Sequence, residues 1–224
     1  MNKLIKTEEA VRLIHSGDTV LMGGFSNVGC PLHLIYELAK HPEINNLSTV
    51  SEDFGYTDLS FPQGPELLLN NGQLKKITVS FLGHTAAEKA YNEGKLEIEL
   101  VPQGTLAERI RCGGAGLGGF YTPTGVGTEV EKGKETKVIN GRKYILELPL
   151  RGNVALVKAY MADTMGNAVF KYTANNFNLC MATAADTVIL EVEKLVEPGE
   201  IEPDAVHMSG IFVDYIVLEE GAMF

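Results

Sequence analysis

The sequence predicts an α/β protein built on a mostly parallel sheet, with helices on both faces and a β-rich C-terminal half. Two observations carry this prediction. Strand and helix patterns alternate over the first half of the chain, and strand patterns dominate after Cys112. The 224 residues contain no internal repeat, low-complexity tract or linker, so we expect one domain over residues 1–224.

The first predicted helix covers residues 7–17, with the sequence TEEAVRLIHSG. Thr7 is expected to cap the N-terminus of this helix, because its hydroxyl can accept a hydrogen bond from a free backbone amide. Glu8 and Glu9 then lie in the first turn, where the helix dipole favours negative charge. Gly17 is expected to end the element.

A strand is expected over residues 19–22, and a glycine-containing turn leads from it to a second helix. Pro31 suits the first turn of that helix, which has Leu32, Ile35 and Leu38 on one face. The alternation continues with strands over residues 47–51, 75–83 and 96–101 and helices over residues 64–72, 85–94 and 105–111.

The pattern changes at the glycine-rich run CGGAGLGGFYTPTGVGT, residues 112–128. We expect no regular element there, because glycine weakens both helices and strands. A hairpin should turn at Asn140-Gly141, since these residues accept the positive φ of a tight hairpin turn. The remaining prediction is two strands around a turn at residues 165–167, a helix over 175–186, and strands over 187–196 and 211–218.

The composition excludes several classes of partner. The net charge of −10 argues against nucleic acid and anionic membranes, because both attract basic surfaces. No apolar run approaches the roughly 18 residues that a membrane helix needs. Acidic residues stand near the N-terminus where a signal peptide has its apolar core, so we expect a cytoplasmic location.

The cysteines and histidines show no metal pattern. Cys30, Cys112 and Cys180 are far apart and form no CxxC pair, which fits a reducing compartment and excludes a zinc knuckle or a disulfide framework. The five histidines do not stand at ligand spacing from one another. We therefore expect no metal site.

Two glycine patterns raise the question of phosphate binding. The stretch GGFSNVGCP, residues 23–31, follows a strand and precedes a helix, and glycines there let a backbone approach a phosphate closely. It is not a nucleotide triphosphatase loop, because Cys30-Pro31 stands where Lys-Ser/Thr is required. The formal GxGxxG at Gly114, Gly116 and Gly119 follows a predicted helix instead of a strand, so it does not predict a dinucleotide site.

Two side chains are candidates for nucleophilic chemistry. Cys30 at the helix start, with His33 three residues later, fits an activated thiolate, although a small half-buried cysteine is the more ordinary interpretation. Glu52 follows a predicted strand, at the edge where parallel sheets bind ligands, and lies beside Asp53. A partly desolvated carboxylate there fits a nucleophile or a base, and a solvated acidic loop is the alternative.

Several long motifs resemble the family I CoA-transferases. The stretch GDTVLMGGFSNVGCP, residues 17–31, resembles the signature of that family, and residues 101–135 resemble its most recognisable block. Residues 175–204 and 210–217 are similar to the closing segments. The resemblance covers essentially the whole chain. It is to the α (A) subunit of acetate/butyrate–acetoacetate and 3-oxoacid CoA-transferases, whose fold is an open three-layer α/β/α sandwich.

The resemblance implies roles for the glycine loop and for a partner chain. Coenzyme A is implied as a substrate, with no permanently bound cofactor, and a β subunit of similar size is implied as the partner in an α2β2 assembly. Phe25 is expected beneath the turn, and the helix N-terminus beyond the loop is expected to face the pyrophosphate. The implied CoA-binding residues are Gly24, Phe25, Ser26, Asn27, Val28, Gly29 and Cys30.

The same resemblance implies that no catalytic nucleophile lies on this chain. In the family, the nucleophilic glutamate belongs to a Ser-Glu-Asn-Gly motif of the β subunit, and that motif is absent from these 224 residues. The nearest string, residues 51–55, has Asp in place of Asn and an extra Phe before Gly. Because the two subunits share a fold, Glu52 remains the alternative nucleophile.

The motifs favour short monocarboxylates such as acetate, butyrate and acetoacetate as acyl groups. The alternatives are a 3-oxoadipate or succinyl-CoA:3-oxoacid transferase, a sugar-phosphate isomerase-like enzyme, and a CoA-binding subunit without catalysis. A further hypothesis places Gly113–Gly119 and the turn at residues 102–104 at the interface or cleft shared with the β subunit.

Overall fold

A computed structural model describes residues 3–54, 64–83 and 85–219, and these form one central sheet and a small second sheet. Seven strands of the central sheet run in the order β11-β10-β8-β1-β2-β3-β4, and all neighbours along this order are parallel. The short strand β9 pairs antiparallel with β8. The strands are β1 (Thr19–Met22), β2 (Leu47–Val50), β3 (Leu74–Val79), β4 (Glu97–Leu100), β8 (Gly152–Asp163), β9 (Ala168–Val169), β10 (Ala185–Val196) and β11 (Tyr215–Leu218).

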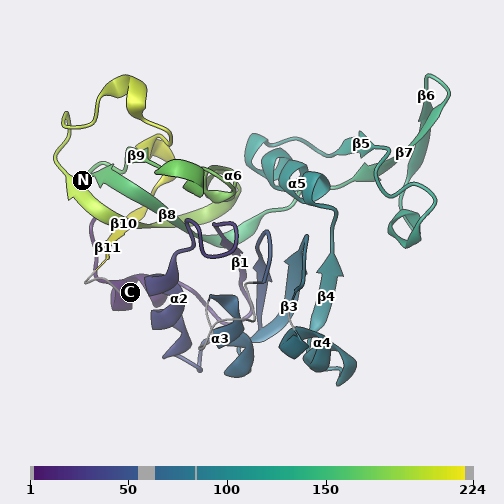
Figure 1. Cartoon of the computed structure of the whole chain (residues 1–224), viewed down its shortest axis with the longest axis horizontal. Coiled ribbons are helices and arrows are strands. Elements are labelled where there is room, and N and C mark those ends of the chain that lie inside the picture. The colour runs from purple at the N-terminus through teal and green to yellow at the C-terminus, as the bar shows by residue number, and fades with distance from the viewer. Residues whose placement is uncertain (1–2, 55–63, 84, 220–224) are drawn as a thin grey trace.

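Helices cover both faces of this sheet, and each face has its own apolar core. The helices α1 (Thr7–Val11), α2 (Leu32–Ala39), α3 (Pro65–Asn70) and α4 (Thr85–Asn92) contribute to one core. The helices α5 (Gln103–Ala115) and α6 (Asn178–Thr183) contribute to the other. Figure 1 shows the two groups on opposite sides of the strands. The predicted α/β fold, with helices on both faces of a mostly parallel sheet, is confirmed.

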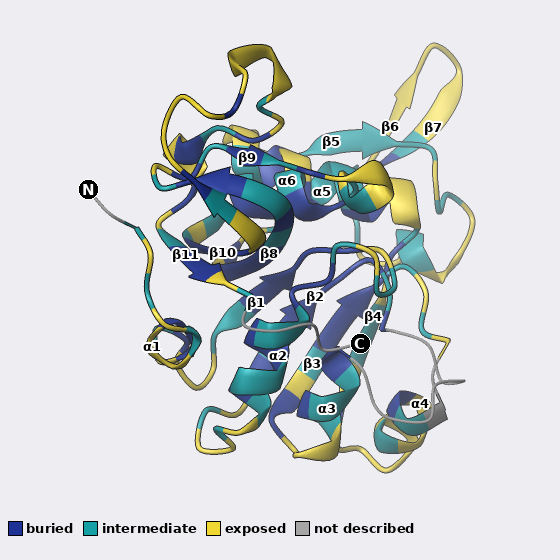
Figure 2. Cartoon of the chain, turned by 60° about the vertical axis from the view of Figure 1, so that its left-hand side comes forward, coloured by how far each residue is buried: buried dark blue, intermediate teal, exposed yellow. Residues whose placement is uncertain are grey.

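Burial on both faces explains the sequence of the central strands. Residues 154–157 of β8 and 188–192 of β10 are continuously buried, and most of them are apolar. Such runs are typical of parallel strands, which have helices above and below them. Figure 2 shows dark blue, the colour of buried residues, over much of β8 and β10, with teal and yellow where these strands are less buried.

The second sheet forms an arm that projects from the central body in Figure 1. It has the order β5-β7-β6 and is antiparallel, with β5 (Phe120–Thr122), β6 (Thr136–Ile139) and β7 (Arg142–Glu147). The predicted hairpin turn is confirmed, because Asn140 and Gly141 have φ angles of 48° and 77°. All four residues of β6 are exposed, and Figure 2 shows them so. Short 3₁₀ helices cover Glu129–Glu131, Tyr172–Ala174, Pro203–Ala205 and Gly210–Phe212.

The glycine-rich run corrects one prediction. Helix α5 continues through Gly113 and Gly114 to Ala115, and β5 begins at Phe120, so the run does contain regular elements. A Cβ added to Gly113 would lie 2.1 Å from the Leu150 carbonyl oxygen, and one on Gly114 would lie 2.3 Å from Thr183 Oγ1. These glycines are tolerated in the helix because close packing against its neighbours requires them.

Smaller corrections concern the ends of elements. Lys6, and not Thr7, is the N-cap of α1. The last strand begins at Tyr215, because residues 210–212 form a 3₁₀ turn. The C-terminal half is rich in strands as predicted, but β8, β10 and β11 complete the central sheet, whereas the arm forms a separate sheet.

Candidate active site

The carboxyl ends of β1, β2 and β3 bring the candidate residues together. In chain order, β2, β3 and β4 follow one another on one side of β1, and the next strand of the sheet, β8, lies on the other side of β1. Ligands of open parallel sheets bind beyond the carboxyl ends of the strands at such a change of direction. The loop at residues 23–31 leaves β1 at this point, and Ser51–Asp53 and Ser80 follow β2 and β3.

The glycine loop is folded on itself and tied to the end of β2. The backbone amides of Phe25 and Val28 each donate to the carbonyl of the other, at 3.1 and 3.0 Å. Ser26 lies between them with a φ of 52°. Its backbone N–H and its hydroxyl both donate to Asp53 Oδ2, at 2.8 and 3.0 Å. Contacts within the chain therefore hold the loop in a defined shape.

Other residues of the chain pack closely against the glycines of this loop. A Cβ on Gly23 would lie 1.9 Å from Asn178 Oδ1, and one on Gly29 would lie 2.8 Å from Asn178 Nδ2. Gly24 and Gly29 also have φ angles of 110° and 71°, which side-chain-bearing residues rarely adopt. Internal packing thus gives a physical reason for the glycines, and close approach of a phosphate stays a prediction.

The first turn of α2 is engaged by a buried carboxylate. Leu34 N donates to Glu191 Oε2 at 3.0 Å, and Glu191 is fully buried on β10. A carboxylate at this place is stabilised by the helix dipole in the same way as a bound anion. The Leu34 amide is therefore already engaged by Glu191. A pyrophosphate at this helix end, as the sequence predicts, would have to bind other amides.

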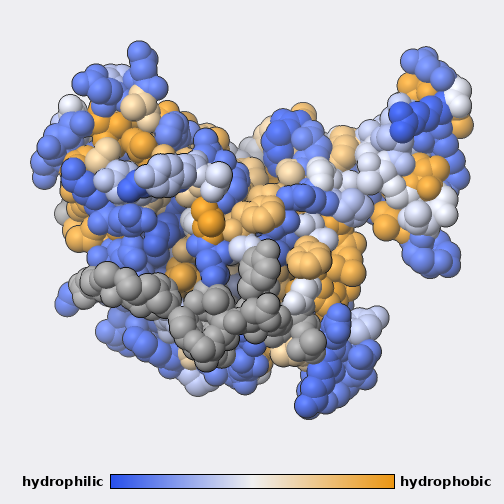
Figure 3. Space-filling view, viewed as in Figure 1, coloured by the Kyte–Doolittle hydropathy of each residue, from blue (hydrophilic) through white to orange (hydrophobic). Residues whose placement is uncertain are grey.

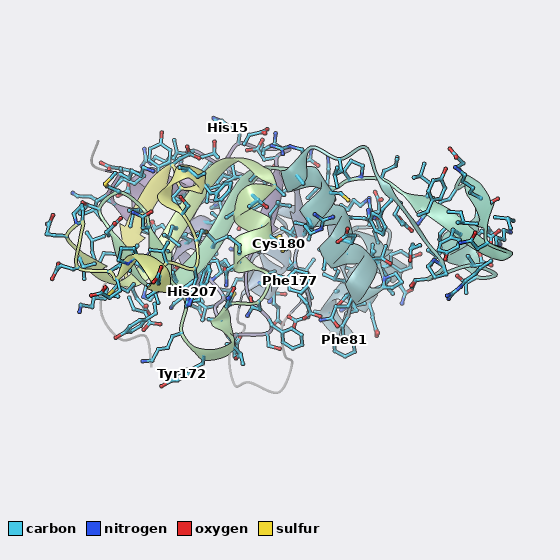
Figure 4. All side chains as sticks on the ribbon, turned by 90° about the horizontal axis from the view of Figure 1, so that it is seen from above. His15, Phe81, Tyr172, Phe177, Cys180 and His207 are labelled. Carbon is cyan, nitrogen blue, oxygen red and sulfur yellow. The ribbon has the colours of Figure 1, made fainter. Side chains whose placement is uncertain are left out.

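The position of Phe25 corrects another expectation. Its side chain is 45% exposed and does not pack beneath the turn. Val28 is exposed to a similar extent. Phe81, which follows Ser80 at the end of β3, is also exposed. Figure 4 shows Phe81 and Tyr172 projecting at the same edge of the molecule, with Phe177 further inside. The candidate site therefore has apolar side chains at its rim.

Glu52 is a buried carboxylate at this edge, with only 4% of its surface exposed. Ser80 Oγ donates to Glu52 Oε1 at 2.7 Å, whereas Oε2 has no hydrogen-bond partner among the residues that the structure describes. Burial raises the pKa of Glu52 to about 7; the Asp53 carboxylate acts in the same direction, and the Ser80 hydroxyl opposes it. Near neutral pH, Glu52 can thus carry a proton or release one.

A small pocket connects Glu52 with the glycine loop. Its volume is about 10 Å³, close to the lower limit for one water molecule. A nucleotide cannot enter a space of this size, so a ligand as large as CoA must lie outside it. The residues around the pocket are Met22, Gly23, Gly24, Ser26, Asn27, Cys30, Ser51, Glu52, Asp53, Gly64 and Pro65.

Cys30 does not have the environment of an activated thiolate. It is buried, and burial strongly raises the pKa of its thiol, with Glu191 and Asp53 acting in the same direction. Burial also raises the pKa of Cys180 to about 11. The interpretation of Cys30 as a small packing residue is the one that this environment supports.

His33 belongs to a charged cluster that the sequence did not predict. His33 Nδ1 lies 3.5 Å from a carboxylate oxygen of Glu191 and 3.5 Å from one of Glu219, and the contact with Glu191 raises the pKa of His33. These three side chains could hold a metal ion. Lys158 Nζ, however, lies 3.3 Å from Glu191 and 3.0 Å from Glu219, so an ammonium group already supplies positive charge. The members come from distant parts of the chain, and no sequence spacing links them.

Comparison with known proteins identifies the family. Residues 4–219 match the family model described as Coenzyme A transferase. The chain therefore belongs to the coenzyme A transferase family. The sugar-phosphate isomerase alternative finds no support in this match.

Relatives of the chain are named as single subunits of enzymes. The chain is 49% identical over 216 residues to a Bacillus subtilis protein whose name describes the probable A subunit of a succinyl-CoA:3-ketoacid coenzyme A transferase, covering 96% of this chain and 89% of that protein. It is 43% identical over 220 residues to the alpha subunit of the acetoacetyl-CoA:acetate/butyrate CoA transferase of Clostridium acetobutylicum, covering 97% and 98%.

A solved structure shows the same fold. An acyl-CoA transferase from Escherichia coli O157:H7, in a thioester complex with CoA, superposes with a TM-score of 0.86 at 22% identity. The match covers 96% of this chain but 47% of that one, so this chain corresponds in length to about half of that protein. Among the described helices, none has the length and apolar character to cross a membrane.

Proposed function

We propose that the chain is the α subunit of a CoA-transferase, which moves CoA from a short-chain acyl-CoA to a free carboxylate such as acetate. The observation that carries this proposal is the match, over nearly the whole chain, to proteins named as the A or alpha subunits of such transferases. The partner is a β subunit, in an α2β2 assembly, which supplies the nucleophilic glutamate. The Ser-Glu-Asn-Gly motif that holds this glutamate in the family is absent from the sequence.

The proposed reaction exchanges one thioester for another without ATP. The glutamate carboxylate of the partner attacks the acyl carbonyl, the C–S bond breaks, and a mixed anhydride and CoA thiolate form. The thiolate attacks the glutamyl carbonyl of the anhydride, giving a glutamyl-CoA thioester and releasing the first carboxylate. The incoming carboxylate then attacks this thioester, and the same steps run in reverse. Positioning and exclusion of water are the main tasks of the protein.

In this proposal the loop at residues 24–30 binds CoA. Three observations support that role: the loop leaves the strand at which the sheet changes direction, it is held in shape by Asp53, and Phe25 and Val28 are exposed at its tip. A chain with a net charge of −10 attracts an anion poorly through its overall charge. Local backbone amides are therefore the expected source of attraction for the phosphates.

The acyl groups proposed are acetate, butyrate and acetoacetate, carried as their CoA thioesters or as free acids. A succinyl-CoA:3-oxoacid transferase is the second candidate, and the 49% identity to the Bacillus subtilis protein favours it specifically. The two candidates differ in the size and charge of the acyl group. A dicarboxylate needs a cationic contact, which the partner chain would have to contribute in part.

Steady-state kinetics of the complex test the proposed function. The chain is purified with its natural partner and assayed with acetoacetyl-CoA or succinyl-CoA and a series of free carboxylates. We expect ping-pong kinetics with the complex and no exchange with this chain alone. Exchange with acetate or butyrate supports the first candidate, and exchange restricted to succinate and acetoacetate supports the second. CoA binding without any exchange by the complex would contradict both.

A further inference from the structure

Asn178, the first residue of α6, is a buried amide whose shortest hydrogen bonds go to backbone atoms, while its Nδ2 also donates to Asn176 Oδ1 at 3.4 Å. Its Oδ1 accepts from Lys158 N at 2.9 Å. Its Nδ2 donates to the carbonyl of Gly29 at 3.0 Å and to that of Ala174 at 3.0 Å. Two carbonyls can only accept and the Lys158 amide can only donate, so these partners fix the orientation of the side chain.

The glycine loop is shaped around this side chain. Gly23 and Gly29 stand at the two ends of the loop, and a Cβ at either position would overlap the Asn178 amide, at 1.9 and 2.8 Å. Asn178 itself has no exposed surface. One side chain therefore touches both ends of the loop and joins them to the neighbouring strand β8.

Asn176 provides a second contact between the same segments. Its Nδ2 donates to the carbonyl of Val28 at 2.9 Å, on the exposed turn of the loop, and to that of Thr173 at 3.0 Å. Its Oδ1 accepts from Phe177 N at 2.6 Å. Asn176, just before α6, thus holds the loop at Val28, and Asn178, at the start of α6, holds it at Gly29.

We propose that Asn178 is a positioning residue that holds the loop at residues 24–30 in the shape that receives the phosphates of CoA. This inference rests on the proposed function. The ligand contacts the loop, and Asn178 acts only through the loop. Asp53 holds Ser26, and Asn178 holds Gly29 and packs against Gly23, so contacts within the chain meet the cost of ordering the loop.

Asn178→Asp is the variant that tests this role. It keeps an acceptor for Lys158 N but places an oxygen where Nδ2 donates to Gly29 and Ala174. Asn176→Asp, at a partly exposed position, removes the contact with Val28 and is available if the first variant does not fold. Asn153→Asp is the matched control, because exposed Asn153 accepts from Thr19 N at the opposite end of β1.

The readout is the ratio of kcat/KM for an acyl-CoA to kcat/KM for the corresponding acyl-pantetheine, which lacks the phosphates. The assay uses the complex with the natural partner. We expect Asn178→Asp to lower this ratio roughly tenfold, the change that loss of buried hydrogen bonds produces, and Asn153→Asp to leave it unchanged. A purely structural role would lower both kcat/KM values equally.

The outcomes separate this inference from the proposed function. A wild-type complex that exchanges CoA, together with an unchanged ratio in both Asn178→Asp and Asn176→Asp, overturns the positioning role and leaves the proposed function standing. A wild-type complex without exchange overturns the proposed function itself, and the positioning role for CoA with it. A lowered ratio in either variant, with a normal control, supports the inference.

Discussion

The chemistry of Glu52 depends strongly on its local environment. It follows β2 at the edge of the sheet, is buried, and lies beside a second carboxylate. Burial raises its pKa to about 7, so the folded chain holds a proton there that the unfolded chain has lost. Glu52 is therefore only partly ionised at neutral pH, and its protonated fraction is a weak nucleophile, which agrees with our placing the nucleophile on the partner.

The raised pKa of Glu52 predicts a pH-dependent stability. Between pH 4.5, the ordinary value for the unfolded chain, and about 7, the folded state binds more protons, so stability falls as pH rises through this range. Glu52→Gln should remove this component and stabilise the chain at pH 8 by roughly 1–2 kcal/mol. Thermal unfolding measured from pH 5 to pH 8, roughly the span of the transition, checks it.

The control for this experiment is Glu193→Gln, because Glu193 is exposed on β10. It should reproduce the pH dependence of the wild type. Equal slopes for the wild type and Glu52→Gln would mean that Glu52 does not bind the proton, and the buried neutral carboxyl group would be the wrong description.

Single residues also show what the sequence could not reveal. The motif around residues 23–31 lies, as predicted, between a strand and a helix, because these elements follow one another locally. The reason for its glycines was not visible, because Asn178 lies about 150 positions further along the chain and meets Gly29 only after folding. The burial of Glu191 against α2 was missed for the same reason.

At the level of elements, the sequence predicted the parts with clear periodicity. The strand at Thr19–Met22 and the hairpin at Asn140-Gly141 lie where they were expected. Helix α5 is longer than expected, since tight packing of Gly113 and Gly114 against neighbouring segments outweighs their low helix propensity. Tertiary contacts decide such cases, and local propensity carries no information about them.

The arm and the end of α5 are the elements where the interface hypothesis can be tested. Gly118 has open space around its Cα, whereas Gly116 has a φ of 69° at the C-cap of α5. We expect Gly118→Val to weaken assembly with the β subunit several-fold while leaving the thermal stability of the isolated chain within about 0.5 kcal/mol. Size measurement of the complex at decreasing concentration checks this.

Gly116→Val is the comparison, because a β-branched residue at that φ strains the helix end itself. It should destabilise the isolated chain as well. If Gly118→Val assembles as tightly as the wild type, the loop after α5 does not contact the partner, and the interface hypothesis for residues 113–119 would be wrong.

At the scale of the whole molecule, the chain is similar to proteins that are named as single subunits of an enzyme. Its fold matches about half the length of a solved acyl-CoA transferase chain, and relatives of similar length are named as subunits. Figure 3 shows apolar side chains on the face that carries the site, between polar regions, and the arm extends beyond the central body. Surfaces of this kind suit a protein that is completed by a second chain.

The measurement that tests the central claim most directly is trapping of the covalent intermediate. The chain alone and the complex with its natural partner each receive acetoacetyl-CoA and then borohydride, which reduces a glutamyl-CoA thioester, and the modified peptide is found by mass. We predict a modified glutamate on the partner in the complex and none on this chain alone, with the same result for Glu52→Gln. A modified Glu52 would contradict this account, because the nucleophile would then lie on this chain.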